Sequence, residues 1–383
     1  MSEFERPIRL GMVGGGNDAF IGAVHRIAAR IDGQFDLVAG ALSSTPEKAQ
    51  ASGQALGLSP DRTYDDFKAM AIREARLKNG IEAVAIVTPN HVHMAAAREF
   101  LKRGIHVICD KPLTSTLADA RKMAQAVEKS DALFVLTHNY TGYPLIRQAR
   151  DMIANGDLGD IRVVQVEYPQ DWLTEPQPED NKQASWRTDP ARSGAGGSTG
   201  DIGTHAFNLA CFVTGLTPES LCADLQSFVD GRQVDDNAHV MLRFAEGARG
   251  MLCCSQVAPG NENALRLRVY GSKGGIEWEQ ENPNLMRYTP FGEPTRLLTR
   301  AGAGATGQPD HLTRTPGGHP EGYLEGFANI YLETAACIRL VQAGQQGSPL
   351  TVLPGLKEGL QGMAFIDACV RSSGRNSAWV SLV

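Results

Sequence analysis

The stretch that decides the fold is Ile8-Arg-Leu-Gly-Met-Val-Gly-Gly-Gly-Asn-Asp-Ala-Phe-Ile-Gly22. Its apolar run at 8–13 predicts a strand, the glycines predict a tight turn, and apolar residues spaced through 21–29 predict a helix. Residues 14–19 fit the pattern G-x-G-x-x-A. In that pattern the first glycine permits the turn, the second lets the backbone approach a pyrophosphate, and the small third residue, Ala19, lets helix and strand pack closely. A glycine-rich turn that binds no ligand is the plainer alternative.

The same alternation of strand and helix continues through the first third of the chain. Compact apolar runs at 37–42, 83–87, 105–109 and 133–136 predict strands buried on both faces, with helical patterns at 92–103 and 117–128 between them. This serial pattern predicts a doubly wound α/β domain with a parallel sheet. It also favours the dinucleotide-binding interpretation of the first turn.

The pattern changes after about residue 141. Strands with period-two alternation are expected at 161–168, 222–229, 238–244, 250–257 and 265–270, and helices at 207–214, 323–341 and 356–370. They predict a second α/β domain with a large, mostly antiparallel open sheet. We therefore expect a dinucleotide-binding Rossmann domain at 1–140 and a substrate-binding and oligomerisation domain at 141–383. The uncovered face of such a sheet is commonly buried against another subunit, which predicts a homo-oligomer.

Composition excludes several classes of partner. The net charge is only −6 and no run is rich in Lys or Arg, which argues against a nucleic-acid or anionic-membrane partner. No apolar run approaches the ~20 residues of a membrane helix, and the N-terminus lacks the pattern of a signal peptide. Seven cysteines without a Cys-x-x-Cys pair indicate reduced thiols and no metal site. These features predict a cytoplasmic protein.

Two loops at the carboxyl ends of expected strands are candidates for cofactor contact. The second strand is followed by Ser43 and Ser44, with no carboxylate before Glu47 for a ribose 2′-hydroxyl and no arginine beside them for a 2′-phosphate. The choice between NAD and NADP is therefore open. The third strand is followed by Thr88-Pro89-Asn90, with His93 further on, where a bound dinucleotide would lie; a simple turn and helix start is the alternative.

A candidate catalytic group follows from three further residues. Lys111 comes directly after the fourth strand, and the glycine-dense run 194–200 leads into Asp201 and His205, four residues apart. On a helix that spacing puts both side chains on one face. A histidine can remove a proton near neutral pH, and an ammonium can stabilise the resulting alkoxide, which together favour oxidation of an alcohol. The alternatives are a surface lysine, an Asp201 that only caps its helix, and a core histidine.

In these residues the chain resembles the glucose–fructose oxidoreductase / inositol dehydrogenase / rhizopine-catabolism family. The resemblance covers nearly the whole length through the 14–22 turn, 88–93, Asp110-Lys-Pro112 (usually Glu-Lys-Pro), 156–159, Trp186-Arg187 before Gly196-Gly197, and Asp201-x-Gly-x-His205. It implies a catalytic Lys111, Asp201 and His205, and dimers or tetramers formed by the open sheet. It also implies cofactor contacts at Gly14, Gly16, Asn17, Ala19, Phe20, Ile21, Ser43, Ser44, Thr88, Pro89, Asn90, His93, Asp110, Lys111, Asn139, Trp186 and Arg187.

The expected activity is NAD(P)-dependent oxidation of a secondary hydroxyl to a ketone. The segments 172–186 and 317–322 are similar to the subgroup that acts on inositols and on anhydro-sugars such as levoglucosan, so the expected substrate is a sugar, an anhydro-sugar or a cyclitol. Two other functions share the fold: an NAD-dependent glycosidase that oxidises its substrate transiently, and a non-catalytic NAD(P)-binding sensor. Candidate substrate contacts, which could equally be structural, are Asn139, Tyr140, Trp172 and Arg192, beside Lys111, Asp201 and His205.

Overall fold

The computed structural model describes residues 6–17, 19–178, 181–305, 310–345 and 352–382. By its contacts the chain divides into two units, Met1–Asn139 with Phe327–Leu360, and Tyr140–Gly326 with Gln361–Val383. The sequence instead predicts contiguous domains, with residues from 141 onward in the second. Residues 327–360 depart from that expectation because helix α10 (Tyr323–Gln342) packs in the first unit. There the ring of Tyr331 lies 5.4 Å from that of Phe35.

The first unit contains a five-stranded parallel sheet in the order β2-β1-β3-β4-β5, which confirms the predicted Rossmann architecture. Its inner strands are apolar throughout, and all five residues of β3 are buried. Because the strands are parallel, the segments that follow β1, β3 and β4 leave the sheet at one edge. The elements are β1 (Ile8–Gly14), α1 (Phe20–Ile31), β2 (Phe35–Ala41), α2 (Pro46–Ala55), α3 (Phe67–Glu74), β3 (Ala83–Val87), α4 (His93–Leu101), β4 (His106–Cys109), α5 (Leu117–Glu128) and β5 (Phe134–Leu136), with short 3₁₀ turns at Pro60–Arg62, Asn90–Val92 and Asn139–Gly142.

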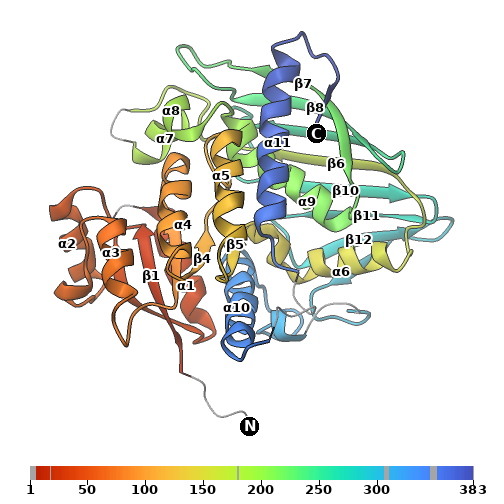
Figure 1. Ribbon diagram of the computed structural model, residues 1–383. Helices are drawn as coiled ribbons and strands as arrows, with labels where there is room; N and C mark the ends of the chain where they lie inside the picture. The colour runs from red at the N-terminus through yellow and green to blue at the C-terminus, as the bar shows by residue number, and fades with distance from the viewer. Residues whose placement is uncertain (1–5, 18, 179–180, 306–309, 346–351, 383) are drawn as a thin grey trace. The chain divides into compact units, whose positions relative to one another are not determined.

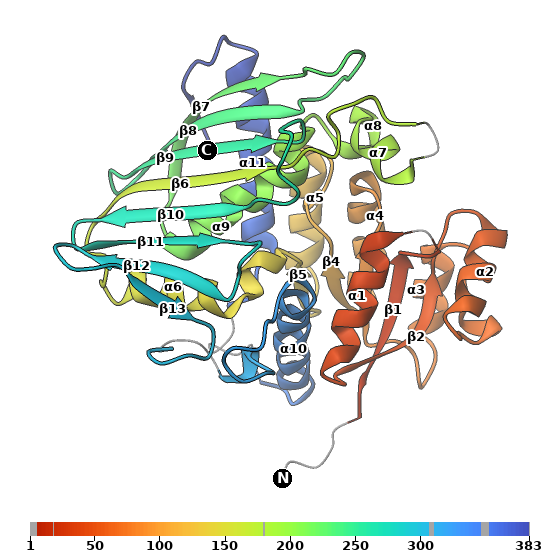
Figure 2. The same cartoon turned by 180° about the vertical axis from the view of Figure 1, so that it is seen from behind.

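The second unit contains a nine-stranded sheet in the order β13-β12-β11-β10-β6-β9-β8-β7-β14 (Figure 2). The β6–β9 pair is parallel and the other pairs are antiparallel, as predicted for a mostly antiparallel sheet. The strands are β6 (Ile161–Pro169), β7 (Pro218–Gln226), β8 (Asn237–Phe244), β9 (Arg249–Ser255), β10 (Arg266–Gly271), β11 (Gly274–Glu279), β12 (Leu285–Pro290), β13 (Arg296–Thr299) and β14 (Val380–Ser381).

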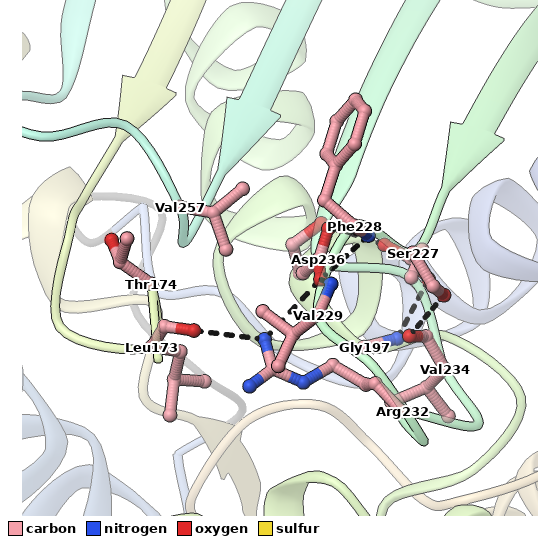
Figure 3. Close-up of polar contacts among 12 residues, drawn as sticks. Leu173, Thr174, Gly197, Ser227, Phe228, Val229, Arg232, Val234, Asp236 and Val257 are labelled. Atoms are coloured by element: carbon pink, nitrogen blue, oxygen red, sulfur yellow. Dashed lines mark hydrogen bonds and ion pairs between the residues drawn. The ribbon is translucent and has the colours of Figure 1, made fainter. Parts of the chain in front are cut away.

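One predicted strand is displaced. The sequence predicts a strand at 222–229, but β7 ends at Gln226. The next residues form a loop because the carboxylate of Asp236 accepts hydrogen bonds from the backbone N–H groups of Phe228 and Val229, each at 3.0 Å (Figure 3). Strands β11 to β14 are not predicted: β11 begins inside the glycine-rich run 271–275, which is typical of a turn, and β13 and β14 have only four and two residues.

Helices cover one face of the nine-stranded sheet. Figures 1 and 2 show α6, α9 and α11 on the same side of the strands. Their packing is apolar, with the rings of Phe207 on α9 and Phe365 on α11 stacked at 4.4 Å. The opposite face is open: Met241 on β8 and Met251 on β9 face each other across the ladder and are 51% and 59% exposed. The helices of this unit are α6 (Pro144–Ala154), α7 (Lys182–Arg187), α8 (Pro190–Ser193), α9 (Thr204–Thr214) and most of α11 (Leu356–Ser373).

None of the helices in the described part of the chain is both long enough and apolar enough to cross a membrane.

Candidate functional site

The glycine turn after β1 is a tightly packed cradle. A Cβ on Gly22 would lie 2.4 Å from the Cα and 2.4 Å from the carbonyl oxygen of Gly15, so helix and turn can meet only without side chains there. The small residue that permits this packing is Gly22, whereas the sequence pattern predicts Ala19. The N–H of Gly16 donates to the carbonyl of Leu42 at 3.2 Å, which holds the turn beside the end of β2.

The N-terminus of α1 fits a pyrophosphate. Its N-cap is Ala19, which makes no side-chain cap, so the first N–H groups of a twelve-residue helix face outward with the positive end of the helix dipole. Phe20 is 62% exposed and Ile21 follows it in the first turn. The N–H of Asn17 donates to the Ser52 hydroxyl at 3.0 Å, and Asp18 lies outside the described residues. The turn therefore fits the phosphates of a dinucleotide.

The two serines after β2 are the candidate contacts to the adenosine ribose. Ser43 is half-buried, and its hydroxyl accepts a hydrogen bond from the N–H of Thr45 at 3.1 Å. Ser44 is exposed. No lysine or arginine occurs between Asp32 and Glu47 in the sequence. This edge can therefore hydrogen-bond a hydroxyl, and the first cation after the two serines is Lys48, which is exposed in the first turn of α2.

The loop after β3 is held by a buried histidine. Thr88 and Pro89 leave the strand, and Asn90 is buried at the start of the 3₁₀ turn. The two ring nitrogens of His93 lie 2.9 Å from the Thr88 carbonyl and 2.9 Å from the Pro112 carbonyl. Burial lowers the pKa of this histidine. The geometry favours a role in which His93 joins the 88–90 loop to the Lys111-Pro112 loop, over the direct cofactor contact that the family resemblance implies.

The loop after β4 carries the candidate lysine. The Asp110 carboxylate accepts hydrogen bonds from the N–H of Lys111 at 2.9 Å and from the hydroxyl of Thr137 at 3.0 Å. Lys111 is half-buried and precedes a cis peptide bond to Pro112. The aspartate that replaces the family's usual glutamate therefore fixes the backbone from which the lysine extends.

Two further candidate side chains, His138 and Asn139, follow β5 in the first unit. Burial first, and then the charge of Lys111, lowers the pKa of His138 to about 3, so this histidine is a poor proton acceptor at neutral pH. The amide nitrogen Nδ2 of Asn139 is buried and finds no hydrogen-bond acceptor among the described residues. Such an amide fits a bound group that offers an oxygen, as a nicotinamide carboxamide or a substrate hydroxyl does.

In the second unit, Asp201 lies in a wide π-helical turn (Thr199–Gly203) that runs into α9. The N-cap of α9 is Gly203, so the capping role considered for Asp201 is wrong. Its Oδ2 accepts hydrogen bonds from Nε of Arg187 at 3.2 Å and from Nε2 of Gln256 at 3.0 Å. These two donors fix the orientation of the carboxylate.

His205, in the first turn of α9, lies against aromatic rings. It is 7% exposed, and its ring centroid is 4.8 Å from that of Tyr140 in an edge-on arrangement. The Tyr140 hydroxyl lies 2.5 Å from the Tyr168 hydroxyl, which donates to Oδ1 of Asn263 at 2.7 Å. Burial raises the pKa of both tyrosines, so both hydroxyls keep their protons. The candidate base thus packs against the rings of two tyrosines that keep their hydroxyl protons.

The same network reaches Trp172. Its indole N–H donates to Oε1 of Gln170 at 3.0 Å, and Nε2 of Gln170 donates to Oδ1 of Asn263 at 2.7 Å. The indole is half-buried, not in the core. A partly open aromatic face beside amides and hydroxyls is the kind of surface that binds a polyol.

Three further predicted contacts lie on the short helices α7 and α8. The guanidinium carbon of Arg187 lies 4.3 Å from the ring centroid of Trp186, and its Nε holds Asp201. This geometry favours a positioning role for Arg187 over the predicted cofactor contact. Arg192 is half-buried on α8.

Several residues of the site escape sequence reasoning. Gln256 is 3% exposed and reaches Asp201 from the end of β9, 55 residues away along the chain. Asn263 joins the two tyrosine hydroxyls to Gln170. Its only signal in the sequence is a place in a polar loop. Lys111 belongs to the first unit, and Asp201 and His205 belong to the second.

Two protein-family models match the chain, and each match lies within one of the two units. A family model described as "Oxidoreductase family, NAD-binding Rossmann fold" matches residues 8–138, and one described as "GFO/IDH/MocA C-terminal domain" matches residues 146–277. The chain is 66% identical to an oxidoreductase from Sinorhizobium meliloti, whose crystal structure gives a TM-score of 0.91 over 98% of this chain and 100% of that one.

Two more distant relatives carry names that include a substrate. An inositol dehydrogenase homologue from Azotobacter vinelandii, in complex with NADH and myo-inositol, is 34% identical, with a TM-score of 0.90 over 98% of each chain. A levoglucosan dehydrogenase from Pseudarthrobacter phenanthrenivorans is 29% identical over 72% of this chain and 74% of its own.

Proposed function

Because the chain belongs to the Gfo/Idh/MocA family of NAD-binding oxidoreductases, we propose that it oxidises a secondary ring hydroxyl of a cyclitol, sugar or anhydro-sugar to a ketone. The observation that carries the proposal is the geometry around His205. A buried histidine packs against the ring of Tyr140, and in the turn that leads into the same helix the Asp201 carboxylate accepts hydrogen bonds from Arg187 and Gln256. This set can accept a proton and bind hydroxyl groups.

When bound, NAD would supply the hydride acceptor for the reaction, and the glycine turn and the start of α1 would hold its phosphates. His205 takes the proton from the hydroxyl on the reacting ring carbon, which places the negative charge on its oxygen as the C–H bond breaks. The ammonium of Lys111 stabilises this developing alkoxide. Asp201 binds a hydroxyl of the same ring and so aligns the substrate. The joint action of Lys111 and His205 on one hydroxyl is the part of the proposal that mutagenesis must test.

The proposed substrate is a cyclic polyol because of the groups near His205. The chain of hydrogen bonds through Tyr140, Tyr168 and Asn263 continues to Gln170 and Trp172, and it supplies hydroxyl and amide groups beside an aromatic face. A site built to hydrogen-bond several hydroxyls discriminates strongly against analogues that lack them. The inositol and levoglucosan named for two relatives are the first probes to try.

NAD is the proposed cofactor in preference to NADP. The segment after β2 offers hydroxyls at Ser43 and Ser44 and has no arginine beside them to bind a 2′-phosphate; its first cation is Lys48, in the first turn of α2. We expect kcat/KM to be higher with NAD than with NADP, as measured with one polyol at saturation. A preference for NADP would contradict this assignment.

Absorbance at 340 nm tests the proposed function. The purified chain is mixed with NAD and, in turn, inositols, aldoses, anhydro-sugars and glycosides. Growth of NADH with one polyol supports the dehydrogenase. Release of free sugar from a glycoside without net NADH would favour the transient-oxidation glycosidase instead. Tight NAD binding with neither reaction across the whole panel would favour the sensor.

The open face of the nine-stranded sheet supports a homodimer or homotetramer. Met241 and Met251 lie opposite each other on neighbouring strands and are largely exposed. Apolar side chains gathered on a sheet face are usually buried against a partner. We expect light scattering to give the mass of a dimer or tetramer for the natural chain and a lower mass for Met251→Arg. A monomer in the natural chain would contradict the proposal.

A further inference from the structure

One buried carboxylate holds the turn that precedes the candidate catalytic residues. Asp235 is 6% exposed, and its Oδ1 accepts a hydrogen bond from the N–H of Gly197 at 2.7 Å. Its Oδ2 accepts three more, from the Ser198 hydroxyl at 2.6 Å, the Thr199 N–H at 2.8 Å and the Thr199 hydroxyl at 2.7 Å. A carboxylate has about four lone-pair sites, so these donors use its full capacity.

The residues that Asp235 holds lead directly into the candidate site. The π-helical turn that carries Asp201 begins at Thr199, and α9, which carries His205, follows it. The N–H of Asp201 donates to the carbonyl of Gly197 at 2.8 Å, so the first residue held by Asp235 also fixes the backbone of Asp201. Any displacement of this segment therefore moves the carboxylate, and the helix start that bears the imidazole moves with it.

Close packing against neighbouring residues restricts the backbone position of the 197–203 segment. A Cβ at Gly197 would lie 2.0 Å from the backbone oxygen of Asp235, and one at Gly203 would lie 3.0 Å from Sγ of Cys254. The backbone N–H of Ser198 also donates to the Asp235 carbonyl at 2.8 Å. The turn is thus pressed onto the start of β8 and the end of β9, with Asp235 as its main polar anchor.

The carboxylate of the next residue, Asp236, holds a different segment of the chain. Its carboxylate accepts the N–H groups of Phe228 and Val229, and it pairs with Nη1 of Arg232 at 3.3 Å. Nη1 of Arg232 also donates to the carbonyl of Leu173 at 3.0 Å, so the arginine lies between Leu173 and Asp236 (Figure 3). Two adjacent buried aspartates therefore hold two different segments, and only Asp235 holds the one that bears Asp201.

We propose that Asp235 is a positioning residue for the reaction: it fixes the turn that sets the places of Asp201 and His205. The inference rests on the proposed function for its kinetic consequence, but its structural consequence stands apart from it. The reaction slows steeply when preorganised catalytic groups are displaced, and a displacement of about 1 Å lowers the rate roughly 100-fold. NAD affinity does not depend on this turn, because the glycine cradle that fits the cofactor lies in the first unit.

The test compares Asp235→Asn and Thr199→Val with the control Asp236→Asn. In Asp235→Asn an amide NH₂ replaces one acceptor and faces N–H or O–H donors, while Thr199→Val removes one hydroxyl donor from the same carboxylate. The control changes an equally buried neighbour in the same way. For each variant we would measure kcat and KM for the polyol, NAD affinity by fluorescence titration, melting temperature, and hydrogen–deuterium exchange of the 197–205 amides.

The two anchor variants are expected to lose about 10- to 100-fold in kcat, with NAD affinity unchanged and faster exchange at 197–205. The loss should be smaller for Thr199→Val, which leaves the other donors in place. The control is expected to melt at a lower temperature, because Arg232 loses its buried counter-charge, while it keeps the kcat of the natural chain. Natural kcat in both anchor variants, or unchanged exchange at 197–205, would overturn the proposal. If the natural chain oxidises no polyol, the proposed function fails, and the exchange data alone decide the role of Asp235.

Discussion

Replacing His205 by alanine is expected to slow polyol oxidation about 10²- to 10⁴-fold, the usual contribution of a general base. NAD affinity should be unchanged, because the groups that fit the cofactor phosphates lie in the glycine turn and α1 of the first unit.

The matched control is His311→Ala, which removes an exposed histidine of the same unit and should leave kcat unchanged. Steady-state rates at 340 nm and a fluorescence titration of NAD supply the two numbers needed for each variant. Turnover of His205→Ala at the natural rate, with NAD still bound, would remove this histidine from the mechanism.

Adding one methyl group at Gly22 is expected to have the second largest effect. In Gly22→Ala the new Cβ would lie 2.4 Å from the backbone of Gly15, and no flexible side chain is there to give way. Overpacking of this kind costs about 1–3 kcal/mol. Expressed as lost NAD affinity, that is roughly 5- to 150-fold. Because the turn cradles the cofactor, the loss should appear in the dissociation constant of NAD.

Gly362→Ala makes the same change in another helix and serves as the control. The nearest atom to its new Cβ would be Cγ2 of Thr204, at 4.0 Å, which is ordinary contact. Alanine is the better helix former by up to about 1 kcal/mol, so this variant should be as stable as the natural chain or more stable. Isothermal titration with NAD and thermal melts separate the two variants. Equal NAD affinity in Gly22→Ala and the natural chain would contradict the cradle.

The sequence predicts those parts of the fold whose signal is local. The run from Ile8 to Gly22 contains a strand, a turn and the start of a helix. The buried strands of the first sheet can be recognised in the sequence as short apolar runs. Strands β11 to β14 are not predicted, because β11 begins inside the glycine-rich run 271–275 and β13 and β14 are only four and two residues long. The predicted strand at 222–229 extends too far along the chain because Asp236 holds Phe228 in a loop.

The candidate site divides in the same way. Lys111, Asp201 and His205 stand out because they follow strands or glycine runs. The residues that hold them cannot be recognised from the sequence, because they are distant along the chain: Gln256 lies 55 residues from Asp201, and Asp235 lies 38 residues from Gly197. Such pairings depend on how β8 and β9 meet the glycine turn, which no local pattern contains. The side chain of Asp201 pairs with Arg187 and does not cap α9, and only the structure reveals this.

The central claim is that a hydride passes from a ring carbon of a polyol to NAD, and isotope transfer tests it most directly. The substrate identified at 340 nm is prepared with deuterium on its secondary ring carbons and incubated with the enzyme and NAD. We expect one deuterium in each molecule of reduced cofactor and one ketone for each NADH formed. Reduced cofactor without deuterium, or label that returns to the sugar without net NADH, would contradict it.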